Sequence, residues 1–578
     1  MRLCLHQEVR LPACSTAADP ESRPSRRPRY TRILAAAATV FLLAASLPGF
    51  AAEWFVSTAG SDSTGTGTLQ KPFRTIRHAA AGSVSSAGDT ITVRGPPSNR
   101  TYNECEVRLR HRLVLRTHPG ERAHIQCGNT SDVAVRIDVN ASGSRVAGLE
   151  ISGGYYGVML MTNWEQGGPS SAHGARNVVL EDLLIHDTGR DGIKITPKSD
   201  NATIRRVEIH ATGVGYPPGT PDDSKNADGI DNVNGSGMVV EDSYIHDTAT
   251  TGLYFKGGAA DVVIQRNRIE NTGDAGILVG FDTSPEFFDL QLNPGYYEAI
   301  RGTVRNNYVR NAGYAGIGLY ASRDSLVANN TIVNSARKGH APLYFGITFQ
   351  DWDPAAGRPA NRNPMLRNNL VIQDGGRCVE IRYSSELGGL SGLSGSPGSD
   401  YNGFQASCRF RDARPGSNLT DGSLAQWRST TGADANSMSA TFTVDATGHL
   451  PAGSPAIDRG VALSQVLDDI DGQIRPTRYD IGADEYAGSN PGPSPRNGSA
   501  PLVPPAPGPA TAGERPGSAG MPAAAGDHTA TGSAPVPAGV VHAEAQRQVR
   551  ITAPAVVAWQ RFMAWLGAAR DRVTLQME

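Results

Sequence analysis

One short phrase recurs along the middle of the chain with nearly constant spacing, and it limits the possible folds more than any other feature. The copies read Ile-His-Asp-Thr-Gly or close variants, and their apolar anchors stand at Ile185, Ile209, Ile245, Ile269, Val309 and Val333. The anchors are 24, 36, 24, 40 and 24 residues apart, so that two steps are one period plus an insertion. A period in the twenties, made of short β-branched runs between Gly, Asn and Asp, predicts a solenoid in which each copy forms one coil.

The composition agrees with a turn-rich β protein. The 578 residues include 66 glycines, and only 19% of the residues are charged. The 54 Lys and Arg residues nearly balance the 56 Asp and Glu residues, for a net charge of -2, which excludes a strongly basic nucleic-acid-binding surface. We therefore expect an all-β fold, a single-stranded parallel β-helix, in which each short strand pairs with the same strand of the next coil about 4.8 Å away.

The first 52 residues are typical of a secretory signal peptide. An apolar run over 33–47 follows Arg26, Arg27, Arg29 and Arg32, and small residues come next at Gly49, Ala51 and Ala52. Because the run is short for a helix that spans a bilayer, a membrane anchor is the less favoured alternative. We expect a secreted or cell-surface protein.

Export permits disulfides, and four cysteines follow the leader. Cys105 and Cys127 are 22 residues apart, close to one coil, and Cys378 and Cys408 are 30 apart, which fits one coil plus a loop. We expect these two pairings. Metal binding by these cysteines is not expected, since the spacing C-x-x-C does not occur.

Pattern and composition divide the rest of the chain. A short helical pattern at Phe73, Ile76 and Ala80 indicates that residues 53–101 form an N-terminal cap over the open end of the coils. Coils are expected over 102–386, and an irregular segment with a C-terminal cap over 387–487. Residues 488–545 are rich in Pro, Gly and Ala and predict a disordered linker, and 546–578 predict an amphipathic tail helix that associates with a surface.

Insertions break the period at 161–175, 214–226, 281–300 and 350–364, and several of them are rich in aromatic residues. In repeat proteins such insertions gather on the functional face. Alignment of the copies on the glycine that opens the following strand places Lys194, Asp231 and Tyr254 in one outward column on neighbouring coils. Lys256 and Tyr320 belong to the next outward column. Basic, acidic and aromatic groups thus converge on three adjacent coils.

Acidic residues accompany this column. Asp228 and Asp231 lie in the stretch Asn-Ala-Asp-Gly-Ile-Asp at 226–231, and Asp222 and Asp223 precede it. Several carboxylates can form a Ca²⁺ site, because this ion takes six to eight oxygen ligands in irregular geometry. Asp-Gly is also an ordinary turn in such coils, as at Asp191, so a purely structural role is the alternative.

Four segments after the leader follow a recognisable series: Val56-Ser57, Gly60-Ser61-Asp62, Pro72-Phe73-Arg74-Thr75-Ile76 and Gly88-Asp89-Thr90-Ile91-Thr92-Val93-Arg94. The series resembles the opening of secreted right-handed parallel β-helix proteins of the pectate-lyase-like group. That resemblance implies a right-handed coil with an N-terminal helical cap.

Ala227-Asp228-Gly229-Ile230-Asp231 resembles the acidic D-D-G-x-D cluster with which family 9 pectate lyases hold Ca²⁺. Ala227 replaces the first acid, which Asp222 or Asp223 would have to supply. Lys256 follows 25 residues after Asp231, about one coil later, where the resemblance places a lysine base. Lys194 is a second candidate base or an ion-pair partner of Asp231.

The resemblance implies β-elimination from a uronate-containing polymer. A cation neutralises the uronate carboxylate, and the lysine accepts the proton on the neighbouring carbon. We expect Tyr254, Tyr320 and Trp164 to contact sugar. The expected partner is an acidic polysaccharide, with the tail offering association with the cell surface and the protein acting as a monomer.

Two other functions fit parts of the sequence. The stretch 226–231 also resembles the N-T-D-G-I signature of polygalacturonase-type glycoside hydrolases, but the matching coil at Thr250-Thr251-Gly252 lacks the acid pair that hydrolysis needs. The closing motifs at 454–458, 469–472 and 480–486 resemble those of choice-of-anchor Q surface proteins. They favour a noncatalytic cell-surface or carbohydrate-binding solenoid.

The repeated phrase itself carries polar columns. His186, His210 and His246 share an outward column and could bind a transition metal, although His-Asp is an ordinary filler at this turn. Asn271 and Asn311, in register with Asp187 and Asp247, predict a polar ladder inside the coils that satisfies backbone groups of the turns.

Overall fold

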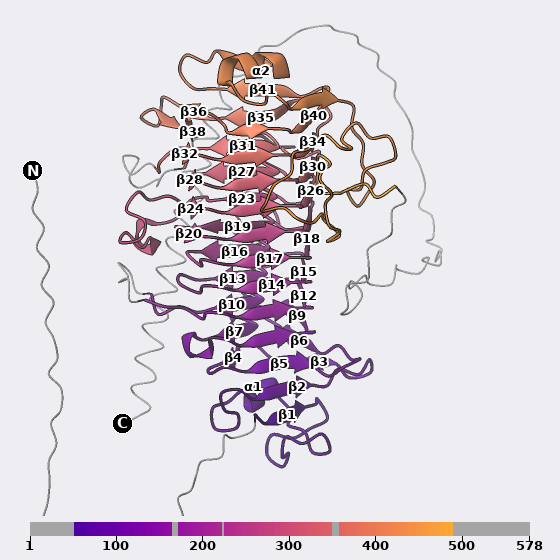
Figure 1. The fold of residues 1–578 in the computed structure, drawn as a ribbon. Coiled ribbons are helices and arrows are strands. Elements are labelled where there is room, and N and C mark those ends of the chain that lie inside the picture. Colours follow the sequence, from indigo (N-terminus) through magenta and orange to yellow (C-terminus); the bar gives the residue numbers. More distant parts are fainter. Residues whose placement is uncertain (1–50, 165–171, 222–224, 349–357, 489–578) are drawn as a thin grey trace, which may run out of the picture. The chain divides into compact units, whose positions relative to one another are not determined.

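The computed structural model describes residues 51–164, 172–221, 225–348 and 358–488. The described residues form a stack of coils with three long sheets along its faces (Figure 1). Nearly all of the expected signal peptide, the linker and tail from 489 onward, and Asp222 and Asp223 lie outside the described residues. Within them, no helix has the length and apolar character that crossing a membrane requires.

Each coil contributes one strand to each of three twelve-stranded sheets, here called A, B and C. The strands of sheet A are β1 (Glu53–Val56), β2 (Thr90–Val93), β5 (Val114–Thr117), β8 (Arg145–Ala147), β11 (Val179–Glu181), β14 (Thr203–Arg205), β17 (Val239–Glu241), β21 (Val263–Gln265), β25 (Thr303–Arg305), β29 (Leu326–Ala328), β33 (Met365–Arg367) and β39 (Ser399–Asp400). The strands of sheet B are β3 (Thr101–Tyr102), β6 (His124–Cys127), β9 (Glu150–Gly153), β12 (Leu184–His186), β15 (Glu208–His210), β18 (Tyr244–His246), β22 (Arg268–Glu270), β26 (Tyr308–Arg310), β30 (Thr331–Val333), β34 (Leu370–Ile372), β40 (Gly403–Gln405) and β43 (Met438–Ala440).

Sheet C holds most of the residues that the sequence singles out. Its strands are β4 (Val107–Leu109), β7 (Val135–Ile137), β10 (Val158–Leu160), β13 (Ile193–Ile195), β16 (Ile230–Val233), β19 (Leu253–Lys256), β23 (Ile277–Val279), β27 (Ile317–Tyr320), β31 (Leu343–Gly346), β35 (Arg377–Ile381), β41 (Arg409–Asp412) and β42 (Leu419–Gly422). A five-stranded sheet consists of β20 (Ala259–Ala260), β24 (Ala299–Ile300), β28 (Ser322–Arg323), β32 (Asn361–Arg362) and β38 (Leu393–Ser394). A small hairpin pairs β36 (Tyr383–Ser384) with β37 (Leu390–Ser391), and 3-10 turns lie at η1 (Val139–Ala141) and η3 (Pro285–Phe287).

The core is a column of stacked apolar side chains, as the repeat predicts. The inward residues that follow each opening glycine are completely buried: Ile193, Ile230, Leu253, Ile277 and Ile317. Parallel pairing keeps equivalent residues level, since Ile193 pairs with Ile230 and Ile230 with Leu253. The expected all-β, parallel β-helix architecture is therefore confirmed.

The backbone conformation explains why the repeated phrase contains Asp or Asn. Asp187, Asp247, Asn271, Asn311 and Asn334 all have positive φ, between 46° and 56°, directly after a strand of sheet B. Asn and Asp tolerate this left-handed backbone better than other non-glycine residues. The chain must turn at this point in every coil, and this requirement produces the repeat.

The polar ladder inside the coils is formed by residues other than Asn271 and Asn311, which the sequence suggested. Asn271 donates to Asp247 at 3.1 Å and Asn311 donates to Asn271 at 3.1 Å, but these bonds lie on the surface. The fully buried ladder joins Asn267, Asn307, Asn330, Asn369 and Asn402, whose amides bond from one coil to the next at 2.9–3.0 Å. It lies at the turn between sheets A and B, where buried amides satisfy backbone carbonyls such as that of Ile264.

The ends of the stack are covered by short helices. At the first coil α1 (Ile76–Ala79) is shorter than the apolar pattern suggests, because Thr75 caps it and Phe73 instead bridges to Val56. At the last coil α2 (Leu424–Thr431) buries Trp427 against Phe410. Sheet pairing extends beyond the expected coil limits of 102–386, since β1 and β2 join sheet A and β43 joins sheet B.

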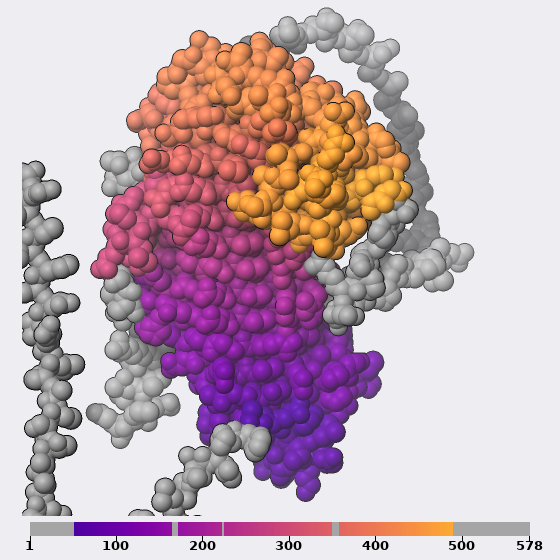
Figure 2. Space-filling view, in the orientation of Figure 1, coloured from indigo at the N-terminus to yellow at the C-terminus, as the bar shows by residue number. Residues whose placement is uncertain are grey.

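The two expected disulfides are present. Cys105 is bonded to Cys127 and Cys378 to Cys408. After β43 the chain returns along the outside of the coils, and Figure 2 shows this yellow-orange segment lying against the coils. Residues 442–486 of this segment are called the strap below.

Candidate active site

The outward column that the sequence predicts on sheet C is present in the structure. Lys194 of β13 pairs in register with Asp231 of β16, and Asp231 pairs with Tyr254 of β19. Lys256 lies at the end of β19, level with Val233. Parallel stacking thus brings residues up to 62 positions apart (194 to 256) into three adjacent coils.

Three carboxylates meet at this point. Asp191, Asp228 and Asp231 each offer an oxygen, and these oxygens lie within 4.8 Å of one another. All three residues are nearly inaccessible, with exposed fractions of 1%, 2% and 1%. Asp191 was not predicted as a site residue. Asp191-Gly192 and Asp228-Gly229 occupy the same place on adjacent coils, and this register could have indicated that Asp191 lies beside Asp228.

The hydrogen bonds leave part of the cluster unsatisfied. Asp191 Oδ1 accepts the backbone N–H of Asp228 at 3.0 Å, while Asp228 Oδ1 accepts from the Thr250 hydroxyl at 2.7 Å and the Thr251 N–H at 2.9 Å. Asp228 Oδ2 and Asp231 Oδ1 are buried and accept no hydrogen bond. Buried oxygens without partners are costly, and they mark a place where a cation can be held.

Lys194 is the nearest positive charge. Its ammonium group donates to Asp231 Oδ2 and lies 3.9 Å from Asp191 Oδ2. Burial lowers the pKa of Lys194, but the charges of Asp231 and Asp191 outweigh burial and raise it above the ordinary value. Lys194 therefore forms an ion pair with Asp231 in which its charged form is favoured.

The three acids differ in their electrostatics. Burial, followed by repulsion from Asp231, raises the pKa of Asp228 to about 6, and the same two causes raise the pKa of Asp191 well above its ordinary value. Burial also raises the pKa of Asp231, but the ammonium groups of Lys194 and Lys256 outweigh it, and the pKa lies below the ordinary value. Three carboxyl groups thus share the field of two lysines, and only Asp231 gains enough from them to have a lowered pKa.

Lys256 stands beside the cluster in a different setting. Its ammonium group donates to the backbone oxygen of Asp282 at 2.9 Å and lies 4.5 Å from the centre of the Tyr254 ring. Lys194 pairs with carboxylates, whereas Lys256 forms no ion pair with a carboxylate in the described part of the chain. It also remains partly exposed, as a group that meets a polymer must be.

The insertion at 281–300 forms a wall next to Lys256. Glu298 is completely buried and accepts from the Gly257 N–H at 2.9 Å, from Thr283 and from Arg358. Farther along, Asp289 pairs with Lys198 at 2.7 Å. These contacts join the insertion to the coils on both sides of Lys256, and neither Glu298 nor Arg358 was predicted from sequence because each lies inside an irregular insertion.

The three aromatic residues expected to contact sugar are packed instead. Tyr254, Tyr320 and Trp164 are only 2%, 4% and 5% exposed. Tyr320 packs edge-on against Phe281, and the Trp164 indole N–H donates to the Glu286 carbonyl at 2.9 Å. In the structure these rings pack into the walls of the site, and little of their surface is open.

The histidine column is also in register. His186, His210 and His246 stack with ring centres 5.2 and 5.0 Å apart on sheet B. Their neighbours are Glu150 and Glu208, which lie 3.5 Å from His186 and 3.4 Å from His246. This column lies on a different sheet from the carboxylate cluster and does not contribute to it.

A comparison with protein families agrees with the observed fold. Residues 123–289 match the family model described as a right handed beta helix region. The chain is a right-handed parallel β-helix protein. No curated protein matches it in sequence.

Several solved structures are similar to this β-helix protein at low sequence identity. Pectate lyase Pel9A is 14% identical over 75% of this chain and 96% of that chain, with a TM-score of 0.43. XylC in complex with xylose is 11% identical over 75% of this chain and 98% of that chain, with a TM-score of 0.44. The A-module of the mannuronan C-5 epimerase AlgE6 from Azotobacter vinelandii is 13% identical over 68% of this chain and 89% of that chain, with a TM-score of 0.36.

Proposed function

We propose that this β-helix protein is an exported polysaccharide lyase that cleaves a uronate-containing polymer by cation-assisted β-elimination. The observation that carries the proposal is the meeting of three buried carboxylates, two of them with unpartnered oxygens, beside a lysine that is free of carboxylate ion pairs in the described residues. β-Elimination needs a cation that neutralises the uronate carboxylate and a base that removes the proton next to it.

The residues present fit a hard divalent cation such as Ca²⁺. Asp228 Oδ2 and Asp231 Oδ1 are unpartnered acceptors, and Asp191 adds a third carboxylate within 4.8 Å. In this proposal Asp191 supplies from the preceding coil the acid that Ala227 lacks. When bound, Ca²⁺ would neutralise a substrate carboxylate and withdraw charge from the carbon that loses its proton.

The two lysines take different roles in this scheme. Lys194 remains charged because Asp231 and Asp191 raise its pKa, and it holds Asp231 in place. Lys256 is the proposed base and accepts the proton in its neutral form. Its contact with the Asp282 carbonyl and its position over the Tyr254 ring fix the ammonium group at the edge of the cluster, while Glu298 anchors the adjacent Gly257.

A second candidate, glycoside hydrolysis, is favoured by the opposite pKa shifts of two neighbouring acids. Asp228, with a pKa of about 6, suits a general acid, and Asp231, with a lowered pKa, suits a nucleophile or base. The oxygens of the cluster lie within 4.8 Å, less than the about 6.5–9.5 Å between the carboxyl groups of inverting enzymes. A hydrolase built on this pair would therefore retain the configuration of the sugar.

One experiment separates these functions. The purified protein is incubated with a panel of polyuronates, and the ultraviolet absorbance of unsaturated product is followed with and without chelator. We expect unsaturated product that chelator abolishes and that Lys256→Ala reduces at least about 100-fold, the scale of a lost general base. The matched control is Lys338→Ala, a lysine outside the cluster.

Other outcomes would overturn the proposal in distinct ways. Reducing ends without unsaturation would establish hydrolysis, and loss of that activity in Asp228→Asn would locate it. Binding without any product, on every polymer tested, would establish the noncatalytic carbohydrate-binding alternative. Unsaturated product that survives Lys256→Ala would remove Lys256 from the role of base.

A further inference from the structure

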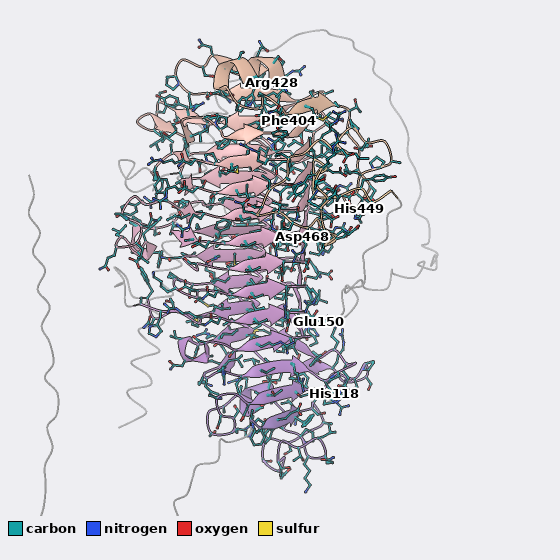
Figure 3. The ribbon with its side chains drawn as sticks, in the orientation of Figure 1. His118, Glu150, Phe404, Arg428, His449 and Asp468 are labelled. Carbon is teal, nitrogen blue, oxygen red and sulfur yellow. A yellow bond between two sulfur atoms is a disulfide. The ribbon has the colours of Figure 1, made fainter. Side chains whose placement is uncertain are left out.

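A second cluster of metal-ligand residues lies in the strap, away from sheet C. The strap packs on the coils through Arg475, which donates to Asn306 at 3.2 Å, and through the Ala483 N–H, which donates to the Thr331 hydroxyl at 2.9 Å. Asp468 adds an ion pair with Arg266 at 2.9 Å. In Figure 3 Asp468 lies beside the coil strands, and His449 lies farther out in the same segment.

Three side chains converge inside the strap. Ligand atoms of His449, Asp471 and Asp484 lie within 4.8 Å of one another, and His449 Nε2 is 2.9 Å from Asp471 Oδ2. Asp484 is only 1% exposed. Its Oδ2 accepts the Leu450 N–H at 2.8 Å, but its Oδ1 is buried and accepts no hydrogen bond. An unpartnered buried oxygen in such a cluster indicates a missing ligand.

The imidazole of His449 is held in the orientation typical of a metal ligand. Its Nδ1 faces the Thr447 hydroxyl at 2.8 Å and Asp445 Oδ2 at 3.3 Å, so that Nε2 points toward Asp471. Asp445 Oδ1 also accepts the backbone N–H of His449 at 2.9 Å. Metal-binding histidines usually engage a carboxylate through the ring nitrogen that does not bind the metal, which fixes the ring and its tautomer.

Asp471 is positioned by a second supporting carboxylate. Asp469 is completely buried, and its Oδ1 accepts the N–H groups of Asp471 at 3.0 Å and Gln473 at 2.7 Å. These bonds fix the turn Asp469-Ile470-Asp471-Gly472 that presents the Asp471 carboxylate. Each of the two partly exposed ligands of the cluster, His449 and Asp471, thus has its own supporting carboxylate.

The buried arginine of the strap is committed elsewhere. Arg475 pairs with Glu485 at 2.7 Å. The buried Asp484 Oδ1 therefore takes no hydrogen bond from this arginine and stays open toward His449 and Asp471.

We propose that His449, Asp471 and Asp484 bind one divalent transition-metal ion of the Zn²⁺ class. An imidazole nitrogen with two carboxylates suits Zn²⁺, which takes N and O ligands at about 2.0–2.2 Å, better than Ca²⁺, which prefers oxygen alone. The ion would join three segments of the strap that are 22 and 13 residues apart in sequence (449 to 471 and 471 to 484). Its role is to hold the strap in the shape that packs on the coils.

The test uses the purified full-length protein after treatment with chelator. ZnCl₂ is titrated calorimetrically, with CaCl₂ as a parallel titration, into wild type and into His449→Gln, Asp484→Asn, Asp231→Asn and Asp458→Asn. Asp458→Asn is the matched control, because Asp458 lies in the same strap outside the cluster and its φ of 58° suits asparagine. The midpoint of thermal unfolding is measured for each protein with and without Zn²⁺.

We expect one Zn²⁺ site whose affinity falls at least tenfold in His449→Gln and in Asp484→Asn and stays unchanged in Asp231→Asn and Asp458→Asn. Zn²⁺ should raise the unfolding midpoint of wild type and of both control variants only. The proposal is overturned if wild type does not bind Zn²⁺, if both ligand variants bind it as wild type does, or if Asp231→Asn alone abolishes binding. His449→Gln tests the site separately from any folding defect of Asp484→Asn.

Discussion

Replacing Asp231 by asparagine separates a structural role of the Lys194–Asp231 pair from a role in chemistry. Asp231 is 1% exposed and the side chain of Lys194 is 13% exposed, so the pair is buried. Removing one partner of a buried ion pair costs about 3–5 kcal/mol, because the other charge is left without compensation. Asp191 Oδ2 lies 3.9 Å from the Lys194 ammonium group and preserves part of the attraction. We therefore expect Asp231→Asn to lower the free energy of unfolding by about 3 kcal/mol, the lower end of that range.

A double-mutant cycle turns this expectation into a measured coupling. Lys194→Met removes the cation from beside three carboxylates and should cost about 3–5 kcal/mol. In Lys194→Met/Asp231→Asn both charges are absent, so the combined loss should fall short of the sum by at least about 2 kcal/mol. Free energies come from urea denaturation followed by circular dichroism. The exposed pair Arg301–Asp261, at 2.6 Å and with side chains 52% and 59% exposed, is the control, with an expected coupling below about 1 kcal/mol.

The result that would refute this reasoning is additivity. If the two single losses sum to the double loss within about 0.5 kcal/mol, Lys194 and Asp231 do not stabilise each other. If the coupling is present and Lys194→Met still releases unsaturated product from a polyuronate, Lys194 is confirmed as a structural cation. Loss of product in a folded Lys194→Met protein with an intact Lys256 would instead give Lys194 a part in catalysis.

Three further predictions concern the rest of the fold. Asn307→Leu should lower the free energy of unfolding by about 3 kcal/mol, because it leaves several buried groups of the inner ladder unpaired. Asn271→Leu, on the surface ladder, should lower it by less than about 1 kcal/mol. Urea denaturation measures both changes. Burial raises the pKa of Glu150, but the hydrogen bond with His186 and nearby positive charges outweigh it and bring the pKa to about 2. The resulting stability, about 3 kcal/mol, is present above pH 4.5 and is lost as the pH falls toward 2, and thermal melts of wild type and Glu150→Gln should converge over that interval. Reduction of the Cys105–Cys127 disulfide, or its replacement by serines, should cost about 2–4 kcal/mol, and a melt unchanged by reductant would contradict this.

The register of the coils could be read from the sequence because strand pairing repeats one rule. Every insertion begins at a turn of one coil, and after it the chain resumes at the equivalent position of the next coil. The glycine alignment therefore placed Lys194, Asp231 and Tyr254 correctly. The same alignment contained Asp191, but a lone Asp-Gly has the sequence of an ordinary turn. Only the side-chain geometry, with Asp191 accepting the Asp228 N–H, distinguishes a cluster from two unrelated turns.

Burial could not be read from the sequence in the same way. Strand alternation predicts that Tyr254 points out of the coil, and it does, but the insertion at 281–300 covers that face and packs Phe281 near the ring. Likewise the sequence placed the polar ladder at the aspartates of the repeated phrase. The buried asparagines lie one turn earlier, at Asn307 and its equivalents. The Asn-Asn pairs Asn306-Asn307 and Asn329-Asn330 could have indicated this ladder in the sequence.

Neighbouring coils form without a charged residue at the position of Asp231, and this bears on function. In the same outward column, Met159 lies level with Lys194 on the preceding coil and Leu278 lies level with Tyr254 on the following one, so uncharged side chains fit the position of Asp231. Burying three carboxylates is unfavourable unless cations neutralise them, and Lys194 alone does not. A chain that used these coils only as a scaffold would gain stability from apolar residues here. Violations of the folding pattern are expected at functional sites, and the three buried acids at and next to sheet C on these two coils are such a violation.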